Sequence, residues 1–122
     1  MSKQTIRNEA MRIGGEKIFT DKTVDVAYPY TEEVIATVPA GTAEHAKEAF
    51  EIAANYQPSL TRYERQQRLF RAAEIIRDRR EDIAHWLTLE LGICKQHALY
   101  DTGRSYDVFT LAGQLAIQDD GE

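Results

Sequence analysis

The chain has 122 residues, which fits one domain, and 43% of them are hydrophobic, which is sufficient for a core. Its 15 Lys and Arg are outnumbered by 20 Asp and Glu, and the net charge of −5 disfavours nucleic acid as a partner, because phosphate contacts supply most of that affinity. The single cysteine excludes an internal disulfide, and no apolar run approaches the roughly 20 residues that a membrane-spanning helix needs. We therefore expect a cytoplasmic protein with neither nucleic acid nor membrane as a partner.

The first forty residues are predicted to form strands and turns. Residues 1–10 are polar, lack the apolar stretch of a secretory signal and are expected to be flexible. Residues 11–40 predict two β-hairpins. The first turns at Gly14-Gly15, because two glycines tolerate the positive φ angles of a two-residue turn. The second joins two runs of alternating residues through a bend at residues 28–33, where a proline removes a hydrogen-bond donor.

Residues 42–118 have the apolar spacing of helices, and we predict three or four of them. Thr42 is a favourable N-cap, and Thr61 with Glu64 forms a capping box, in which each side chain satisfies a free backbone N–H group. A run of charged residues predicts a helix break near Asp78. It interrupts an apolar stripe formed by Leu69, Ala73, Ile76, Ile83 and Leu87.

The last helix is predicted over about residues 95–117, following a helix C-cap at Gly92. One side of this helix is expected to carry Ala98, Ser105, Phe109, Ala112 and Ala116. Strands followed by helices, rather than alternating strands and helices, indicate the α+β class.

Most signatures of catalysis and cofactor binding are missing from the sequence. Neither a GxGxxG nor a GxxxxGK[ST] loop is present, so no dinucleotide or phosphate loop is predicted. Cys94, the lone thiol, follows a predicted helix C-terminus, where the dipole does not stabilise a thiolate, and we expect it to be buried or half-buried. Its spacing of three from His97 is half a zinc site at best. We therefore assign no catalytic, cofactor-binding or metal-binding residue.

Arginines are the most distinctive charged residues. Seven of them lie between Arg62 and Arg80, but interleaved acidic residues make that stretch typical of a solvated helix face. Arg104 differs, because it heads an apolar stripe formed by Val108, Leu111 and Leu115. Two partners are possible for its guanidinium. One is Asp101 or Asp107 on the same helix, in an ion pair, and the other is an anionic ligand bound through two parallel hydrogen bonds. Spacing alone favours the ion pair.

Two blocks of the sequence resemble a known enzyme family. The segment Pro29–Gly41, which contains Pro-Tyr-Thr-Glu-Glu-Val-Ile, resembles the N-terminal hairpin of the NAD(P)-dependent aldehyde dehydrogenase superfamily, and Glu64–Leu91 resembles its second block. Tyr28 and Glu32 replace the usual Asn and Gly. Together with the segments 60–66 and 103–109, these departures look most like the phosphonoacetaldehyde dehydrogenase branch.

The resemblance implies that residues 11–122 are the N-terminal segment of an aldehyde dehydrogenase domain. In that family, a cysteine downstream of this segment forms a thiohemiacetal with the aldehyde, and a hydride passes to NAD or NADP. The resemblance therefore implies that the chain alone is inactive and binds no cofactor. Its partners would be the remainder of the enzyme and, in a homo-oligomer, further copies.

The resemblance also favours a ligand for Arg104. Family members that act on phosphorylated or phosphonate aldehydes place an arginine on the last helix of this segment, near the substrate's anionic end, and Arg104 matches that place. Substrate binding by Arg104 is therefore the single site assignment. The alternative is a non-catalytic helical binding or scaffold module derived from the family.

Overall fold

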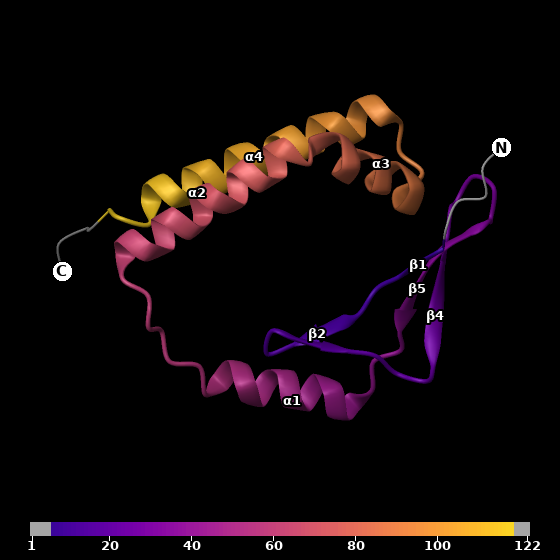
Figure 1. Ribbon diagram of the computed structural model, residues 1–122, viewed down its shortest axis with the longest axis horizontal. Helices are drawn as coiled ribbons and strands as arrows, with labels where there is room; N and C mark the ends of the chain where they lie inside the picture. The colour runs from indigo at the N-terminus through magenta and orange to yellow at the C-terminus, as the bar shows by residue number, and fades with distance from the viewer. Residues whose placement is uncertain (1–5, 119–122) are drawn as a thin grey trace. The chain divides into compact units, whose positions relative to one another are not determined.

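The computed structural model describes residues 6–118, in which short strands precede four helices (Figure 1). The chain divides between Gln57 and Pro58 into two compact units, the first with the strands and one helix, the second with three helices. The predicted α+β order is confirmed. Among the described residues, no helix has the length and apolarity needed to cross a bilayer.

The first predicted hairpin is present in the N-terminal unit. Strands β2 (Met11–Ile13) and β3 (Glu16–Ile18) pair antiparallel. Gly14 and Gly15 form the turn between them with φ angles of 58° and 91°, which residues with a Cβ rarely adopt. The two glycines therefore act as the sequence predicts.

The second predicted hairpin is extended into a three-stranded sheet. Strand β4 (Thr23–Ala27) pairs antiparallel with β5 (Val34–Pro39), and β1 (Arg7–Asn8) pairs parallel with the other edge of β5. Strand β1 lies inside the stretch 1–10 that was expected to be flexible. Its two residues pair with Ala36 and Thr37 of β5, and the amide of Glu9, the next residue, donates to the Thr37 carbonyl over 3.1 Å. Residues 1–5 of that stretch lie outside the described residues.

The β4–β5 turn contains a backbone conformation that glycine favours. Glu32 has a φ of 61°, and its amide donates to the Tyr28 carbonyl over 2.8 Å. A left-handed conformation costs a residue with a Cβ roughly 1–2 kcal/mol, because the Cβ approaches the following carbonyl oxygen. This explains why glycine is usual at this position in the family motif that the segment resembles.

Glu32→Gly is therefore expected to stabilise the protein by about 1 kcal/mol. The gain is somewhat less than the strain energy that is relieved, because glycine loses more conformational entropy on folding. The midpoint of urea unfolding measures the change. Glu33→Gly, one position further on, is the matched control and should not be stabilising, since Glu33 has no positive φ. Equal midpoints for both variants would contradict the strain argument.

Helix α1 (Ala43–Ala54) closes the N-terminal unit. Thr42 caps it as predicted, and His45 completes the cap, because its Nδ1 accepts from the Thr42 amide over 3.2 Å. The helix ends at Ala54, and Asn55 is its C-cap residue. Ile52 lies against the first hairpin, so that a Cβ at Gly14 would come within 3.1 Å of its Cδ1. Among residues 6–57 the buried side chains are those of Ile13, Ile35 and Ala36.

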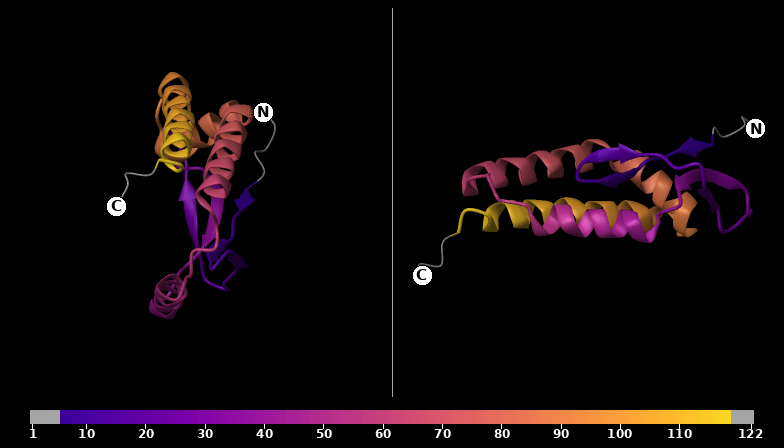
Figure 2. Two further views of the ribbon diagram at one scale, coloured as in Figure 1. Left: turned by 90° about the vertical axis from the view of Figure 1, so that its left-hand side faces the viewer. Right: turned by 90° about the horizontal axis from the view of Figure 1, so that it is seen from below.

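The C-terminal unit is formed by α2 (Arg62–Asp78), α3 (Arg80–Leu91) and α4 (Lys95–Leu115). Helices α2 and α4 run alongside each other (Figure 2). The predicted break near Asp78 is confirmed, since Arg79 alone separates α2 from α3. Gly92 has a φ of 69° and caps α3, as predicted.

Small residues fill the centre of this unit. Ala73, Ala84 and Ala98 are buried, and buried Thr102 donates its hydroxyl to the Ala98 carbonyl over 2.8 Å. Of the residues predicted along one side of α4, Ala98 is buried, whereas Ser105 and Phe109 are exposed. The inward side instead carries Ala98, Thr102, Tyr106, Thr110 and Gly113.

The capping box of α2 makes the stability of this helix depend on pH. The Glu64 carboxylate accepts from the Thr61 amide and from the Thr61 hydroxyl, each over 2.8 Å. These two hydrogen bonds lower the pKa of Glu64. Because the pKa of Glu64 is lower in the folded than in the unfolded state, its contribution is present above the unfolded pKa and is lost as pH falls through the folded one.

Acidification is therefore expected to lower the thermal midpoint of the wild type more than that of Glu64→Gln. Glutamine keeps an oxygen that accepts in the capping box but does not titrate. Circular dichroism at a series of pH values measures both midpoints. Parallel pH profiles for the two proteins would show that the cap makes no pH-dependent contribution.

Apolar side chains of α4 remain uncovered in the C-terminal unit. Val108, Leu111 and Leu115 are 62%, 56% and 52% exposed, although spacing predicts one apolar stripe. Exposed apolar surface of this kind marks interaction or aggregation sites. The 122-residue chain alone is therefore expected to self-associate and to bind a hydrophobic dye. A monodisperse monomer in sedimentation, without dye binding, would count against this expectation.

Candidate functional site

Arg104 lies in the middle of α4 with its side chain exposed. Among residues 6–118, it forms no ion pair with Asp101 or Asp107, so the pairing that spacing alone favours is absent there. Its guanidinium carbon instead lies 5.9 Å from the centre of the Tyr100 ring, one helical turn earlier. The ring supports the guanidinium by a cation–π contact and leaves its N–H groups available to a ligand.

A hollow of about 340 Å³ opens beside Arg104 in the C-terminal unit. Its walls come from the end of α2, the start of α3 and the middle of α4. Three guanidinium-bearing residues, one from each helix, contribute to it: Arg77, Arg80 and Arg104. The other lining residues are Leu99, Tyr100, Thr102, Gly103, Tyr106 and Asp107.

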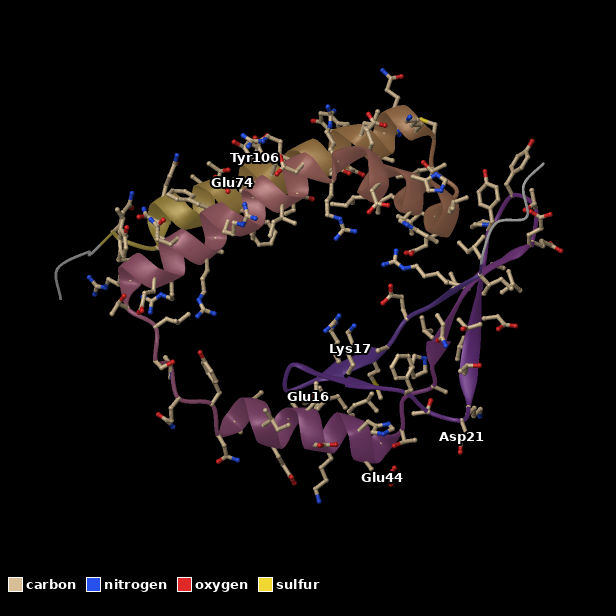
Figure 3. All side chains as sticks on the ribbon, in the orientation of Figure 1. Glu16, Lys17, Asp21, Glu44, Glu74 and Tyr106 are labelled. Carbon is tan, nitrogen blue, oxygen red and sulfur yellow. The ribbon has the colours of Figure 1, made fainter. Side chains whose placement is uncertain are left out.

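Two of the three arginines are held by α4. Arg80 donates from Nε and Nη2 to the Leu99 carbonyl over 3.3 and 3.2 Å, which ties the start of α3 to α4. The guanidinium carbon of Arg77 lies 6.0 Å from the centre of the Tyr106 ring. Tyr106 is labelled on α4 in Figure 3, which also labels Glu74 on α2. Arg77 has a further contact, 3.7 Å from Nε to Asp78 Oδ1.

The charge of this hollow favours anions. Three guanidinium groups line it, and Asp107 is the single acidic residue among its lining residues. Guanidinium groups present fixed pairs of N–H donors that match carboxylate and phosphate oxygens. Tyr100 and Tyr106 also line the hollow, and a tyrosine hydroxyl can donate to a ligand. The arrangement can therefore bind a small anionic group.

Of the three arginines that line this hollow, the sequence singled out Arg104 and did not distinguish Arg77 or Arg80. Alternation with acidic residues predicts a solvated surface for the whole arginine-rich stretch. The prediction is correct for Arg71, which pairs with Glu74 over 3.0 Å, and for Arg79, which pairs with Asp82 over 2.6 Å. The sequence signal that could have separated Arg77 and Arg80 from the other arginines is the predicted helix break near Asp78. These two residues flank the break, and the chain changes direction there beside a neighbouring helix.

A second hollow of about 330 Å³ lies on the other flank of Arg104. It is lined by Asp101, Arg104, Ser105, Val108 and Phe109. Most of its lining belongs to the exposed side of α4. Arg104 thus stands between the two hollows and is the residue common to both.

Cys94 differs from its prediction. It is exposed and is the N-cap residue of α4, although we expected a buried or half-buried thiol after a helix end. Only Gly92, Ile93 and Cys94 separate α3 from α4, and the last of the three is the N-cap residue of α4. Within residues 6–118, no three His, Cys, Asp or Glu residues are grouped to hold a metal ion.

Comparison with known proteins places the chain in a family. The sequence profile of the aldehyde dehydrogenase family matches residues 18–122. The 1-pyrroline-5-carboxylate dehydrogenase of Oceanobacillus iheyensis is 33% identical in an alignment of 99 residues that covers 78% of this chain and 19% of that protein. The chain therefore spans about a fifth of the length of this curated relative.

Crystal structures of aldehyde dehydrogenases contain a segment that has the fold of this chain. Aldehyde dehydrogenase 21 of Physcomitrella patens, crystallised with the reaction product succinate, aligns with a TM-score of 0.89 and 28% identity over 97% of this chain and 25% of that one. A point mutant of betaine aldehyde dehydrogenase from Staphylococcus aureus, in complex with NAD+, aligns with a TM-score of 0.81 and 30% identity over 90% of this chain and 24% of that one. The chain belongs to the aldehyde dehydrogenase family.

Proposed function

We propose that this chain forms the N-terminal part of an enzyme that oxidises an anionic aldehyde to the acid, with NAD or NADP as the hydride acceptor. Phosphonoacetaldehyde is the substrate that the sequence resemblance favours. The observation that carries the proposal is Arg104, which stands on α4 beside a hollow with an excess of positive charge and has a tyrosine rather than a carboxylate as its partner. Such a guanidinium is suited to an anionic ligand.

The names of two relatives support an anionic substrate, whereas those of a lactaldehyde dehydrogenase and a betaine aldehyde dehydrogenase do not. One relative acts on a pyrroline carboxylate, and the product bound to another is succinate, so both compounds carry carboxylate groups. A third was solved with NAD+, which supports a nicotinamide cofactor for the complete enzyme. A bidentate arginine recognises a carboxylate, a phosphate or a phosphonate with the same two parallel hydrogen bonds.

The proposal divides the work between this chain and the remainder of the enzyme. Aldehyde oxidation through a covalent intermediate needs an activated nucleophile and a nearby base. Cys94, the single thiol of the chain, is an exposed helix cap and does not match the family's nucleophile motif. The remainder of the enzyme would supply the nucleophile and hold the cofactor, while this chain supplies the helix that carries Arg104. Further copies would assemble as a homo-oligomer.

The test compares three aldehydes of matched length, which end in a phosphonate, a carboxylate or an uncharged amide. The complete enzyme that contains this sequence is expected to form NADH or NADPH with the highest kcat/KM for the anionic aldehydes. The 122-residue chain alone is expected to form none. Equal kcat/KM values for all three would contradict an anion site. Absence of turnover by the complete protein would favour the alternative, a non-catalytic binding module.

A further inference from the structure

We propose that Arg77 is a second anion-binding residue, which joins Arg104 and makes the enzyme prefer a phosphonate or phosphate over a carboxylate. This inference rests on the proposed function, since it concerns the same substrate group. It goes beyond it, because Arg77 lies on a different helix and nothing in the sequence pattern separates it from the other arginines of its stretch. The two residues contribute to the wall of one hollow from α2 and α4.

Each of the two guanidinium groups rests on a ring of α4. Arg104 lies over Tyr100 and Arg77 over Tyr106, at 5.9 and 6.0 Å from the ring centres. The rings stand six positions apart on one helix, and both line the same hollow. Both contacts use none of the N–H donors of the two arginines, so these donors stay available to an anion.

Arg80 has a different role in the same hollow. Its Nε and Nη2 already donate to the Leu99 carbonyl, so this side chain ties α3 to α4. Its positive charge still adds to the potential of the hollow, but two of its donors are occupied. Arg77 has a weaker competing contact, 3.7 Å to Asp78, with its side chain 60% exposed. Exposed pairs of this kind contribute little, so Arg77 is free to turn to a stronger partner.

The chemistry of the ligand explains why a second arginine matters for one kind of anion. A carboxylate has two oxygens, and one guanidinium fork satisfies both. A phosphate has three strong acceptor oxygens and carries more than one negative charge at neutral pH, and a phosphonate group has the same three oxygens. One fork leaves its third oxygen and part of its charge without a partner. A second guanidinium gives the third oxygen a donor and the remaining charge a partner. Arg77 is therefore expected to strengthen the binding of a phosphonate but not that of a carboxylate.

The test uses Arg77→Gln in the complete enzyme, with Arg71→Gln as the matched control. Both arginines lie on α2 and are exposed, but Arg71 pairs with Glu74 and does not line the hollow. We expect Arg77→Gln to lower kcat/KM roughly tenfold for the phosphonate aldehyde and by less than about twofold for the carboxylate aldehyde. It should also raise the inhibition constant of inorganic phosphate against the phosphonate aldehyde by a similar factor. Arg71→Gln should change none of these values.

Other results overturn the inference. Equal losses for both anionic aldehydes, or no loss, would show that Arg77 does not distinguish them. Weaker inhibition by phosphate with unchanged aldehyde kinetics would mean that the hollow binds a free oxyanion rather than the substrate. If Arg104→Ala lowers activity on both anionic aldehydes while Arg77→Gln changes nothing, the proposed function stands and this inference falls. If neither variant alters the preference for anionic aldehydes, both fall.

Discussion

Arg104→Ala in the complete enzyme is expected to lower kcat/KM for an anionic aldehyde by roughly tenfold to hundredfold, which is the usual size of the loss of hydrogen bonds to a charged group. The guanidinium is supported by Tyr100, and within residues 6–118 its removal leaves no carboxylate without an ion-pair partner. The loss should therefore come from the ligand and not from the fold. Steady-state kinetics with the anionic aldehyde and an uncharged aldehyde of the same length measure it.

Two further variants separate a ligand role from a structural one. Arg104→Lys is expected to recover part of the loss, because an ammonium keeps the charge but cannot form two parallel hydrogen bonds. Asp101→Asn should leave the preference for the anionic aldehyde intact, since Asp101 makes no ion pair with Arg104 among the described residues. Equal loss for charged and uncharged aldehydes, reproduced by Asp101→Asn, would show that Arg104 is a structural ion-pair partner.

Gly113→Ala is expected to destabilise the protein, although alanine favours helices. A Cβ at this position of α4 would lie 2.6 and 2.7 Å from Cε1 and Cδ1 of Phe70 on α2. Real side chains do not approach so closely, so the ring or the helices must move. Overpacking costs about 1–3 kcal/mol, and the better helix propensity of alanine returns up to about 1 kcal/mol. We expect a net loss of about 1–2 kcal/mol in the free energy of unfolding.

The same helix provides the control. Gly103 has open space where a Cβ would be, so Gly103→Ala should raise stability by up to about 1 kcal/mol through helix propensity alone. Urea unfolding followed by circular dichroism compares the two variants. Phe70→Leu should reduce the cost of Gly113→Ala, because the shorter side chain makes room. If Gly113→Ala is as stable as Gly103→Ala, the α2–α4 contact at Phe70 is not tightly packed.

Local features of this protein follow from the sequence because each depends on residues a few positions apart. The Gly14-Gly15 turn, the cap formed by Thr61 and Glu64, and the helix end at Gly92 are all present where they are predicted. Each is a backbone conformation or hydrogen bond that a short segment makes with itself. The order of strands and helices follows from the same short-range patterns.

Other features depend on which segments meet, and short-range patterns do not contain that information. Strand β1 exists because residues about thirty positions later in β5 accept and donate its hydrogen bonds. The inward side of α4 is set by contact with α2 and α3, which places Tyr106 inward and leaves Phe109 exposed. Helical spacing alone offers several apolar sides of similar quality, so the neighbouring helices decide.

The candidate site shows the same division. Arg104 stands out in the sequence because a charge heads an apolar stripe, whereas Arg77 and Arg80 are indistinguishable there from arginines that only pair with nearby acids. The junction at Arg79 and the packing on α4 bring these two residues to the hollow that Arg104 lines. The sequence by itself determined most of the strands and helices and the caps at Thr42, Thr61 and Gly92, and it drew attention to one arginine. Tertiary structure decided which charges share a surface, because that depends on contacts between helices that are distant in the chain.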